Sequence, residues 1–197
     1  KAAFLCRVST DTMRIVGGQY KGRRIDPPRN SPARPTTDYA KEGLFNILQH
    51  STPLEDIRVL DLFAGSGNIS VEFLSRGAAQ VISVEQDKGL HDYQKRVATQ
   101  LTTTTWLQVR ADVFAYLASA VAFGGAYDII FADPPFEMEG TERLPGLVRD
   151  RGLLVPEGLL IVEHSKYTRL DQDPWYDRTR EYGNVLFSFF SPRTPTP

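Results

Sequence analysis

The sequence has few of the residues that build several common kinds of site. It contains one cysteine, Cys6, so no disulfide can form within the chain, which fits a reducing compartment and predicts a cytoplasmic location. Its three histidines, His50, His91 and His164, lack the spacing of metal ligands, so we expect no metal site. No apolar run approaches the roughly 20 residues that cross a bilayer, so we expect no membrane partner.

An excess of charge of either sign is also missing. Lysine and arginine total 23 against 24 acidic residues, which leaves a net charge of -1, so a nucleic-acid partner must be argued from local clusters. With 41% hydrophobic residues among 197, the chain can build one domain with a sizeable core. We interpret residues 1–12 as an upstream extension or a remnant of expression, 13–37 as a basic arm, and 38–197 as the main domain.

Short apolar segments alternate with helical segments from residue 57 onward, which predicts an α/β fold with a parallel sheet covered on both faces. We expect strands at 58–63, 80–85, 106–111, 127–132 and 158–164, with helices near 67–76, 87–101, 112–122 and 141–152. The tail differs, because segments 178–182 and 185–190 flank Gly183-Asn184, which is typical of a tight antiparallel turn. An antiparallel hairpin should therefore close one edge of the sheet.

A glycine-rich turn follows the first predicted strand, with the residues Asp61, Leu62, Phe63, Ala64, Gly65, Ser66 and Gly67 in order. Glycines let a backbone approach a ligand closely, and the next helix offers unpaired N–H groups at its start. The spacing Gly65-x-Gly67-x-x-Ser70 is also close to a dinucleotide fingerprint, so a nicotinamide cofactor, a methyl donor and a purely structural turn stay open. Asp61 favours S-adenosylmethionine, because a carboxylate attracts that cation and repels a pyrophosphate.

Acidic residues end the next two predicted strands. Glu85, with Gln86 beside it, can accept hydrogen bonds from both ribose hydroxyls of either cofactor. Asp112 can accept a hydrogen bond from an adenine amino group beside the backbone of Val113, or it can cap the helix that begins there. The two interpretations of Asp112 are compatible.

The tetrapeptide Asp133-Pro134-Pro135-Phe136 follows the buried strand 127–132 and carries the strongest functional signal. Its prolines remove two backbone donors and fix φ, so the turn is stiff and its carbonyls can accept hydrogen bonds. The Asp133 carboxylate and the Pro134 carbonyl can hold both hydrogens of an amino group, and Asp133 can take the released proton. Phe136 offers a face for base stacking. The alternative is a rigid loop with Phe136 folded into the core.

A cluster of cations precedes the first helix. Its members are Arg14, Lys21, Arg23, Arg24, Arg29 and Arg34, with Tyr20 interleaved and Asp26 as the one acid. The pattern predicts a small hairpin and loop that contact RNA phosphates, or a merely solvated face. Arg34, Thr36 and Thr37 precede a helix expected at 38–50 with Asp38 as its N-cap. They can reach the carboxylate of a methyl donor or cap the helix.

Taken together, these segments resemble the bacterial 16S ribosomal RNA guanine-N2 methyltransferases. The likeness runs in order from Met13 to about Phe190, and it rests on residues 13–23, 34–38, 41–46, 61–67 and 133–136. The glycine turn and the Asp133 tetrapeptide are shared with many amino methyltransferases, whereas residues 14–18 and 34–37 are much more specific. The chain departs from the family at Tyr39-Ala40, where another basic residue is frequent, and at Pro145, which should delay or kink the helix after Phe136.

The resemblance implies a Rossmann-like class I methyltransferase with a seven-stranded, mostly parallel sheet and one reversed strand, preceded by a small β-hairpin. It implies that Asp133 and Pro134 hold a guanine amine and Phe136 stacks on the base. It also implies that Gly65, Gly67 and Glu85 bind S-adenosylmethionine, while the arm contacts 16S RNA on an assembled or partly assembled small subunit. A monomer is the default expectation.

Two other activities remain open at this point. A DNA or protein amino methyltransferase would use the same Asp133 turn, although a DNA enzyme usually carries a larger recognition insertion than these short connections allow. A nicotinamide-dependent oxidoreductase is disfavoured by Asp61 and by the Asp133 tetrapeptide.

Overall fold

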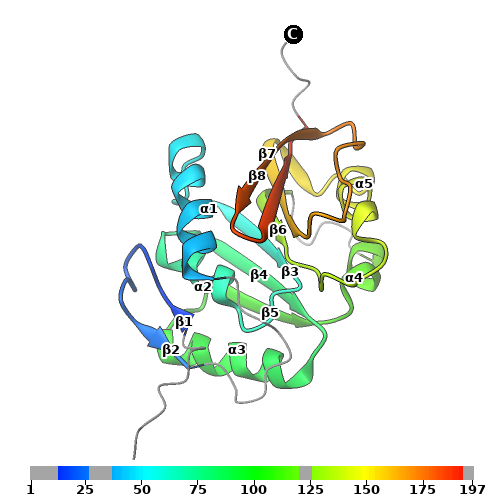
Figure 1. Cartoon of the computed structure of the whole chain (residues 1–197). Coiled ribbons are helices and arrows are strands. Elements are labelled where there is room, and N and C mark those ends of the chain that lie inside the picture. The colour runs from blue at the N-terminus through cyan, green and yellow to red at the C-terminus, as the bar shows by residue number, and fades with distance from the viewer. Residues whose placement is uncertain (1–12, 27–36, 120–125, 193–197) are drawn as a thin grey trace, which may run out of the picture.

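A seven-stranded sheet forms the centre of the structure, a computed structural model that describes residues 13–26, 37–119 and 126–192 (Figure 1). In order across the sheet the strands are β5 (Trp106–Arg110), β4 (Gln80–Glu85), β3 (Arg58–Leu62), β6 (Tyr127–Ala132), β7 (Leu154–His164), β9 (Val185–Phe190) and β8 (Tyr176–Tyr182). The pairings from β5 to β7 are parallel, and β9 runs antiparallel to both of its neighbours. The predicted mostly parallel sheet with one reversed strand is confirmed.

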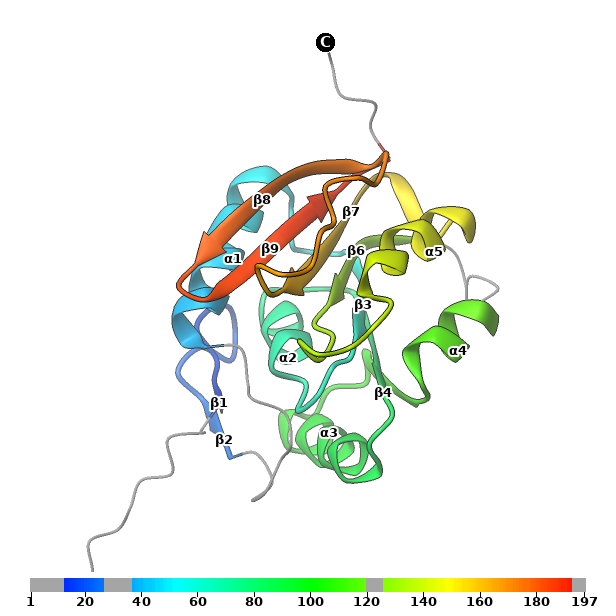
Figure 2. The ribbon, with the colours of Figure 1, turned by 45° about the vertical axis from the view of Figure 1, so that its right-hand side comes forward.

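Helices cover both faces of this sheet (Figure 2). The first face packs against α1 (Asp38–Ser51), α2 (Asn68–Ser75) and α3 (Lys88–Leu101), and the second against α4 (Val113–Ser119) and α5 (Leu144–Asp150). Alternate residues of β3 enter different cores, because Val59 packs with the first group of helices and Leu60 with the second. This explains why the central strands are continuously apolar. None of the helices in the described segments is long and apolar enough to span a bilayer.

Strand β7 begins four residues earlier than the predicted 158–164. It pairs with β6 across an irregularity, since the partner of Tyr127 is Leu154 while the partner of Ile129 is Leu159. Gly158 lies in this bulge, where a Cβ atom would come within 3.0 Å of the Tyr127 carbonyl oxygen. The bulge accommodates both Pro156 and Gly158 within the strand.

Two helix starts refine the predictions. The N-cap of α1 is Thr37 rather than the predicted Asp38, because Thr37 has an extended backbone and its hydroxyl accepts the Ala40 amide at 3.2 Å. Asp38 instead occupies the first turn, where a negative charge interacts favourably with the helix dipole. The helix after Phe136 starts late, as Pro145 predicts: a 3₁₀ turn, η1 (Thr141–Arg143), precedes α5, and Pro145 stands in its first turn.

The basic arm forms a small hairpin of β1 (Met13–Arg14) and β2 (Arg24–Ile25), and it is docked on α2. The Ser75 carbonyl accepts the Gln19 amide at 2.7 Å, and the Ser75 hydroxyl accepts the Tyr20 amide at 2.9 Å. The Val16 amide donates to the Glu72 carboxylate at 2.9 Å. These contacts hold the hairpin as part of the domain rather than as a free appendage. Residues 1–12, which we interpreted as an extension, lie outside the described residues.

Gly18 is the closest point of this docking and provides a test. Its φ is +70°, and a Cβ atom there would lie 1.7 Å from the Ser75 carbonyl oxygen. We expect Gly18→Ala to lower the free energy of unfolding by about 1–3 kcal/mol more than a Gly22→Ala control, because overpacking adds to backbone strain. Gly22 also has a positive φ, +85°, but open space around it. Equal losses in urea unfolding would show that the hairpin does not need this close approach.

Candidate active site

Two turns meet at the carboxyl edge of the sheet. Strands β3 and β6 pair in parallel with Leu62 opposite Ala132, so the glycine turn and the Asp133 turn leave the sheet side by side. A hydrogen bond of 3.3 Å from the Asp133 amide to the Leu62 carbonyl joins them directly. Ligands of open α/β sheets bind at this edge.

The glycine turn has an unusual backbone. Phe63, Gly65 and Gly67 all have positive φ, at 59°, 55° and 81°. The Gly67 amide donates to the Ala64 carbonyl at 2.7 Å, and a Cβ atom on Gly67 would lie 2.6 Å from the Trp106 ring. Glycine is therefore required at position 67 by both the dihedral and the space.

Glu85 anchors this turn from the neighbouring strand. One carboxylate oxygen accepts the Gly65 amide at 2.8 Å and the other accepts the Asp87 amide at 2.7 Å. A carboxylate can accept about four hydrogen bonds, so these two leave capacity for the predicted ribose hydroxyls. Gln86, the other residue predicted to contact the ribose, is exposed beside it. The sequence suggested a ligand contact for Glu85, and the structure adds a role in shaping the turn.

A series of hydrogen bonds between buried side chains supports the glycine turn, and the sequence did not indicate it. The Trp106 indole donates to the Ser83 hydroxyl at 2.9 Å, and that hydroxyl donates to the Gln94 side chain at 2.7 Å. The Gln94 amide nitrogen then donates to the Gly65 carbonyl at 2.7 Å. The available signal was a serine inside the apolar strand β4 and a glutamine on the buried face of α3, which are residues that need partners.

Asp61 lies beneath the glycine turn and is almost fully buried, with 1% of its surface exposed. Its carboxylate accepts the Ser70 hydroxyl at 2.5 Å, so Ser70, the third position of the glycine fingerprint, serves Asp61. Burial raises the pKa of Asp61 to about 7, with a further contribution from Glu85, while the Ser70 hydrogen bond opposes the rise. The carboxyl group is thus poised to change charge near neutral pH.

Asp133 is a second carboxyl group of this edge with a raised pKa. Burial of the carboxyl group lifts the pKa well above its ordinary range, and the negative charges of Glu163 and Asp61 add to the effect. Pro134 is buried, whereas Phe136 is 53% exposed, which excludes the alternative in which its ring folds into the core. The Pro135 carbonyl accepts the Met138 amide at 2.8 Å and turns the chain back. An exposed aromatic ring therefore follows, three residues along the same turn, a carboxyl group whose pKa is raised.

Asp112 and Val113 lie at the end of β5. The Asp112 carboxylate accepts the Ala115 amide at 2.9 Å, which is the capping role predicted as one of its two interpretations. The Val113 side chain is buried in the second core. The predicted contacts with an adenine ring remain compatible with this arrangement, since Asp112 is exposed.

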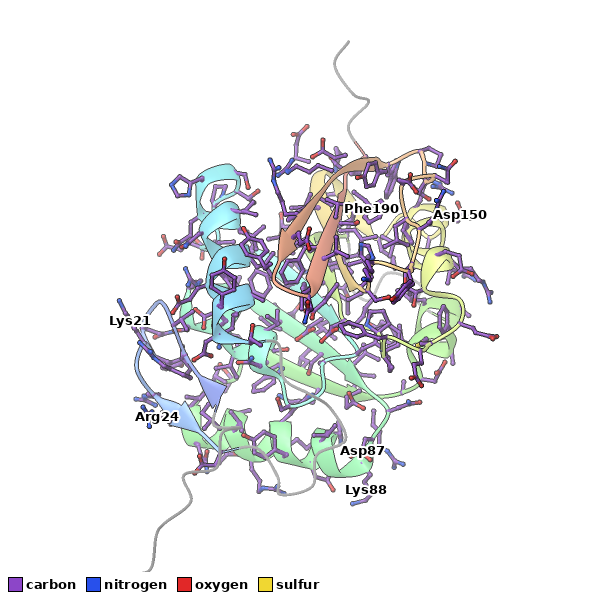
Figure 3. All side chains as sticks on the ribbon, in the orientation of Figure 1. Lys21, Arg24, Asp87, Lys88, Asp150 and Phe190 are labelled. Carbon is purple, nitrogen blue, oxygen red and sulfur yellow. The ribbon has the colours of Figure 1, made fainter. Side chains whose placement is uncertain are left out.

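The hairpin exposes the side chains of Arg14, Lys21, Arg23 and Arg24, and Figure 3 shows Lys21 and Arg24 pointing outward. Tyr20 is half-buried instead: its hydroxyl donates to the Leu101 carbonyl at 3.4 Å, and the Arg23 guanidinium lies 5.1 Å from its ring centroid.

Of the remaining predicted residues, Thr37 caps α1, while Arg29, Arg34 and Thr36 fall outside the described residues. Within the described ranges, no group of three or more potential metal-ligating side chains is assembled.

Lys41 connects the hairpin to the glycine turn, and the sequence reasoning missed it. Its fully buried ammonium donates to the Asn68 side chain at 2.8 Å and to the Arg14 carbonyl at 2.5 Å, and it lies 3.8 Å from the Glu72 carboxylate. Burial lowers the pKa of Lys41, and the negative charge of Glu72 opposes the change. Because Asn68 directly follows Gly67, one buried cation orders both the arm and the turn. A lysine among the apolar residues of α1 was the only signal.

Comparisons with known proteins agree with this geometry. Residues 13–191 match the family described as conserved hypothetical protein 95. Ribosomal RNA small subunit methyltransferase D of Escherichia coli K12 is 36% identical over 181 residues, which cover 90% of this chain and 89% of that protein. The structure of yhhF from Escherichia coli, named a methyltransferase, has 31% identity and a TM-score of 0.76, covering 91% of this chain and 97% of that one.

A hypothetical protein of Thermus thermophilus has the same fold, with a TM-score of 0.78 and 28% identity over 90% of this chain and 98% of that one. The sequence likeness spans nearly the whole chain, and so does the structural likeness. The chain therefore belongs to the family of bacterial small-subunit ribosomal RNA methyltransferases that includes methyltransferase D.

Proposed function

We propose that this chain transfers a methyl group from S-adenosylmethionine to the exocyclic N2 amine of a guanine in 16S ribosomal RNA, on the small subunit or an assembly intermediate. The observation that carries the proposal is the 3.3 Å hydrogen bond from the Asp133 amide to the Leu62 carbonyl, which sets the Asp133 turn, to which we assign the amine, beside the glycine turn. Use of S-adenosylmethionine is the chemistry of the family. We further propose that the protein acts as a monomer in the cytoplasm.

The glycine turn fits a cationic cofactor better than an anionic one. Gly65 and Gly67 leave no side chain between a ligand and the backbone, and the adjoining strand ends carry the Glu85 carboxylate and Asp61, which is negatively charged above its pKa of about 7. Such an edge attracts a sulfonium and an ammonium group and repels a pyrophosphate, which also speaks against a nicotinamide cofactor. When bound, S-adenosylmethionine supplies an electrophilic methyl group.

We assign the parts of the donor to residues around this turn. The residues expected to hold it are Phe63, Ala64, Gly65, Ser66 and Gly67 in the turn, Asp61 below it, Glu85 and Gln86 at the ribose, Asp112 and Val113 at the adenine, and Arg34, Thr36 and Thr37 at the carboxylate. The Thr37 hydroxyl already accepts the Ala40 amide, but it keeps its own hydrogen to donate to a carboxylate.

The Asp133 turn supplies what an aromatic amine needs in order to act as a nucleophile. The lone pair of such an amine is delocalised into the ring, and two acceptors that hold its hydrogens can orient the nitrogen towards the methyl group. We assign these acceptors to the Asp133 carboxylate and the Pro134 carbonyl. As the N–C bond forms, the nitrogen must lose one proton, and a carboxyl group with a raised pKa is suited to receive it. Phe136 then stacks on the base.

RNA is the proposed acceptor because of the exposed cations of the hairpin. Arg14, Lys21, Arg23 and Arg24 lie on one small element that Lys41 ties to the glycine turn, so phosphate contacts there would place RNA near the site. The name of the Escherichia coli relative specifies ribosomal RNA of the small subunit. Guanine is preferred over adenine on the family resemblance alone, since both amines offer the same two hydrogens to Asp133 and Pro134.

The test uses small ribosomal subunits from a strain that lacks its own methyltransferase of this family. The purified protein and S-adenosylmethionine with a labelled methyl group are added, and the RNA is digested to nucleosides. We expect label in 16S RNA as N2-methylguanosine. Label in DNA without label in 16S RNA would overturn the substrate, and N6-methyladenosine would overturn the choice of base.

Asp133 is predicted to act in transfer rather than in donor binding. We expect Asp133→Ala to lower kcat by about 10²–10⁴-fold, because it removes one amine acceptor and the proton acceptor together. Donor affinity measured by calorimetry should stay close to that of the wild type. Glu137→Ala is the matched control, since Glu137 is an exposed carboxylate on the same turn. Unchanged turnover in Asp133→Ala would remove this residue from the mechanism.

Because of Asp61, we expect the free energy of unfolding of the protein to fall as the pH rises. In the folded protein its pKa is about 7 against an ordinary value of 3.8, so the folded state keeps a proton that the unfolded state loses between these values. Wild-type stability should therefore fall across this window, by about 4 kcal/mol at most. The Asp61→Asn variant cannot ionise at this position. Its free energy of unfolding should therefore rise relative to that of the wild type between pH 4 and pH 8.

The control for this experiment is Asp171→Asn, which alters an exposed carboxyl group. It should follow the wild-type dependence on pH, as measured by urea unfolding. If the curves of Asp61→Asn and wild type run parallel, burial of Asp61 does not raise its pKa as described.

A further inference from the structure

The turn that follows β7 presents two side chains to solvent. Ser165 to Thr168 form a hydrogen-bonded turn in which the Thr168 amide donates to the Ser165 carbonyl at 3.1 Å. Tyr167, at its tip, is 84% exposed, and the Lys166 ammonium lies 5.3 Å from the centre of its ring. A tyrosine this exposed gains almost no stability from burial of its ring, so the fold itself does not call for an aromatic residue there.

The base of this turn is nevertheless firmly held. Buried His164 contacts the Ser165 carbonyl through Nδ1 at 2.8 Å and the Ser188 hydroxyl through Nε2 at 2.7 Å. A carbonyl only accepts, so Nδ1 carries the hydrogen, and a neutral ring then accepts from Ser188. Ser188 in turn contacts the Thr179 hydroxyl at 2.7 Å. His164 therefore has a structural role. It ties the turn that carries Tyr167 to the antiparallel strand β9.

The turn leaves the sheet beside the proposed site. Strands β6 and β7 are parallel neighbours with Ala132 opposite Val162, so the turns that follow them emerge at the same edge, about one strand spacing of 4.8 Å apart at their origins. Phe136 and Tyr167 both belong to these turns, and both rings are more than half exposed. One aromatic face thus stands next to Asp133, and a second stands one strand further along with a cation beside it.

We infer that Tyr167 is the stacking platform for a nucleotide that flanks the methylated base, with Lys166 contacting the backbone phosphate. This inference rests on the proposed function. A base drawn into the site at Asp133 leaves its neighbours with uncovered faces, and an aromatic ring outside the site can cover one of them. The paired aromatic ring and cation match the two parts of a nucleotide, its π-face and its phosphate, better than they match an aliphatic protein surface.

The experiment compares Tyr167→Leu with Tyr167→Phe on unmethylated small subunits. Because a stacked base is lost, the leucine variant should raise the KM for subunits about tenfold, while kcat and the KM for S-adenosylmethionine stay at wild-type values. The phenylalanine variant keeps the ring and should behave as the wild type. Equal KM values for Tyr167→Leu and wild type would overturn the inference, and so would a phenylalanine variant as weak as the leucine variant.

Lys166 is tested through salt. Lys166→Ala should reduce the slope of log affinity against log salt by about one, as the loss of one phosphate contact requires. Arg151→Ala is the control, because Arg151 is an exposed cation that precedes the amino-terminal end of β7, whereas Lys166 follows its carboxyl-terminal end. An unchanged slope in Lys166→Ala would contradict the phosphate contact. Wild-type protein that modifies no subunit RNA would instead defeat the proposed function itself, so the two failures are distinguishable.

Discussion

The pairing of β3 with β6 is the constraint on which the site depends. It ends in the hydrogen bond from the Asp133 amide to the Leu62 carbonyl, which fixes the position of one turn relative to the other. Methyl transfer needs the donor carbon and the amine nitrogen in line at short range, and much of its rate comes from this placement. A parallel register between two buried strands is a rigid way to achieve it, because a slip of one residue would turn every side chain to the other face.

The same edge carries ionisable groups whose burial costs free energy. Asp61 and Asp133 lie where burial opposes their ionisation, and Lys41 is a buried cation on the neighbouring helix. Specific partners compensate, including Ser70 for Asp61 and Asn68 for Lys41. The two apolar cores on either side of the sheet supply the stability that offsets these buried charges. The proposed site thus lies at the ends of strands that are mostly apolar along their length.

Sequence reasoning predicted what depends on local pattern. The parallel strands, the glycine turn and the stiff tetrapeptide at Asp133 can each be recognised within fewer than ten consecutive residues. They therefore predicted a mostly parallel sheet and the strand ends at which we place the site. What it could not predict depends on contacts between distant segments. The chain from Trp106 through Ser83 and Gln94, and the links from Lys41 to Arg14 and Asn68, join elements that only the fold brings together. The early start of β7 was missed because its bulge hides the alternation that defines a strand.

The central claim is that the two turns hold the donor and the amine at one place. A crystal structure of the protein with S-adenosylhomocysteine and guanosine tests it most directly. The account predicts that S-adenosylhomocysteine lies against the glycine turn. It also predicts that the guanine N2 lies within about 2.6–3.2 Å of both the Asp133 carboxylate and the Pro134 carbonyl. A guanine bound with its N2 away from Asp133, or a product bound outside the glycine turn, would contradict it.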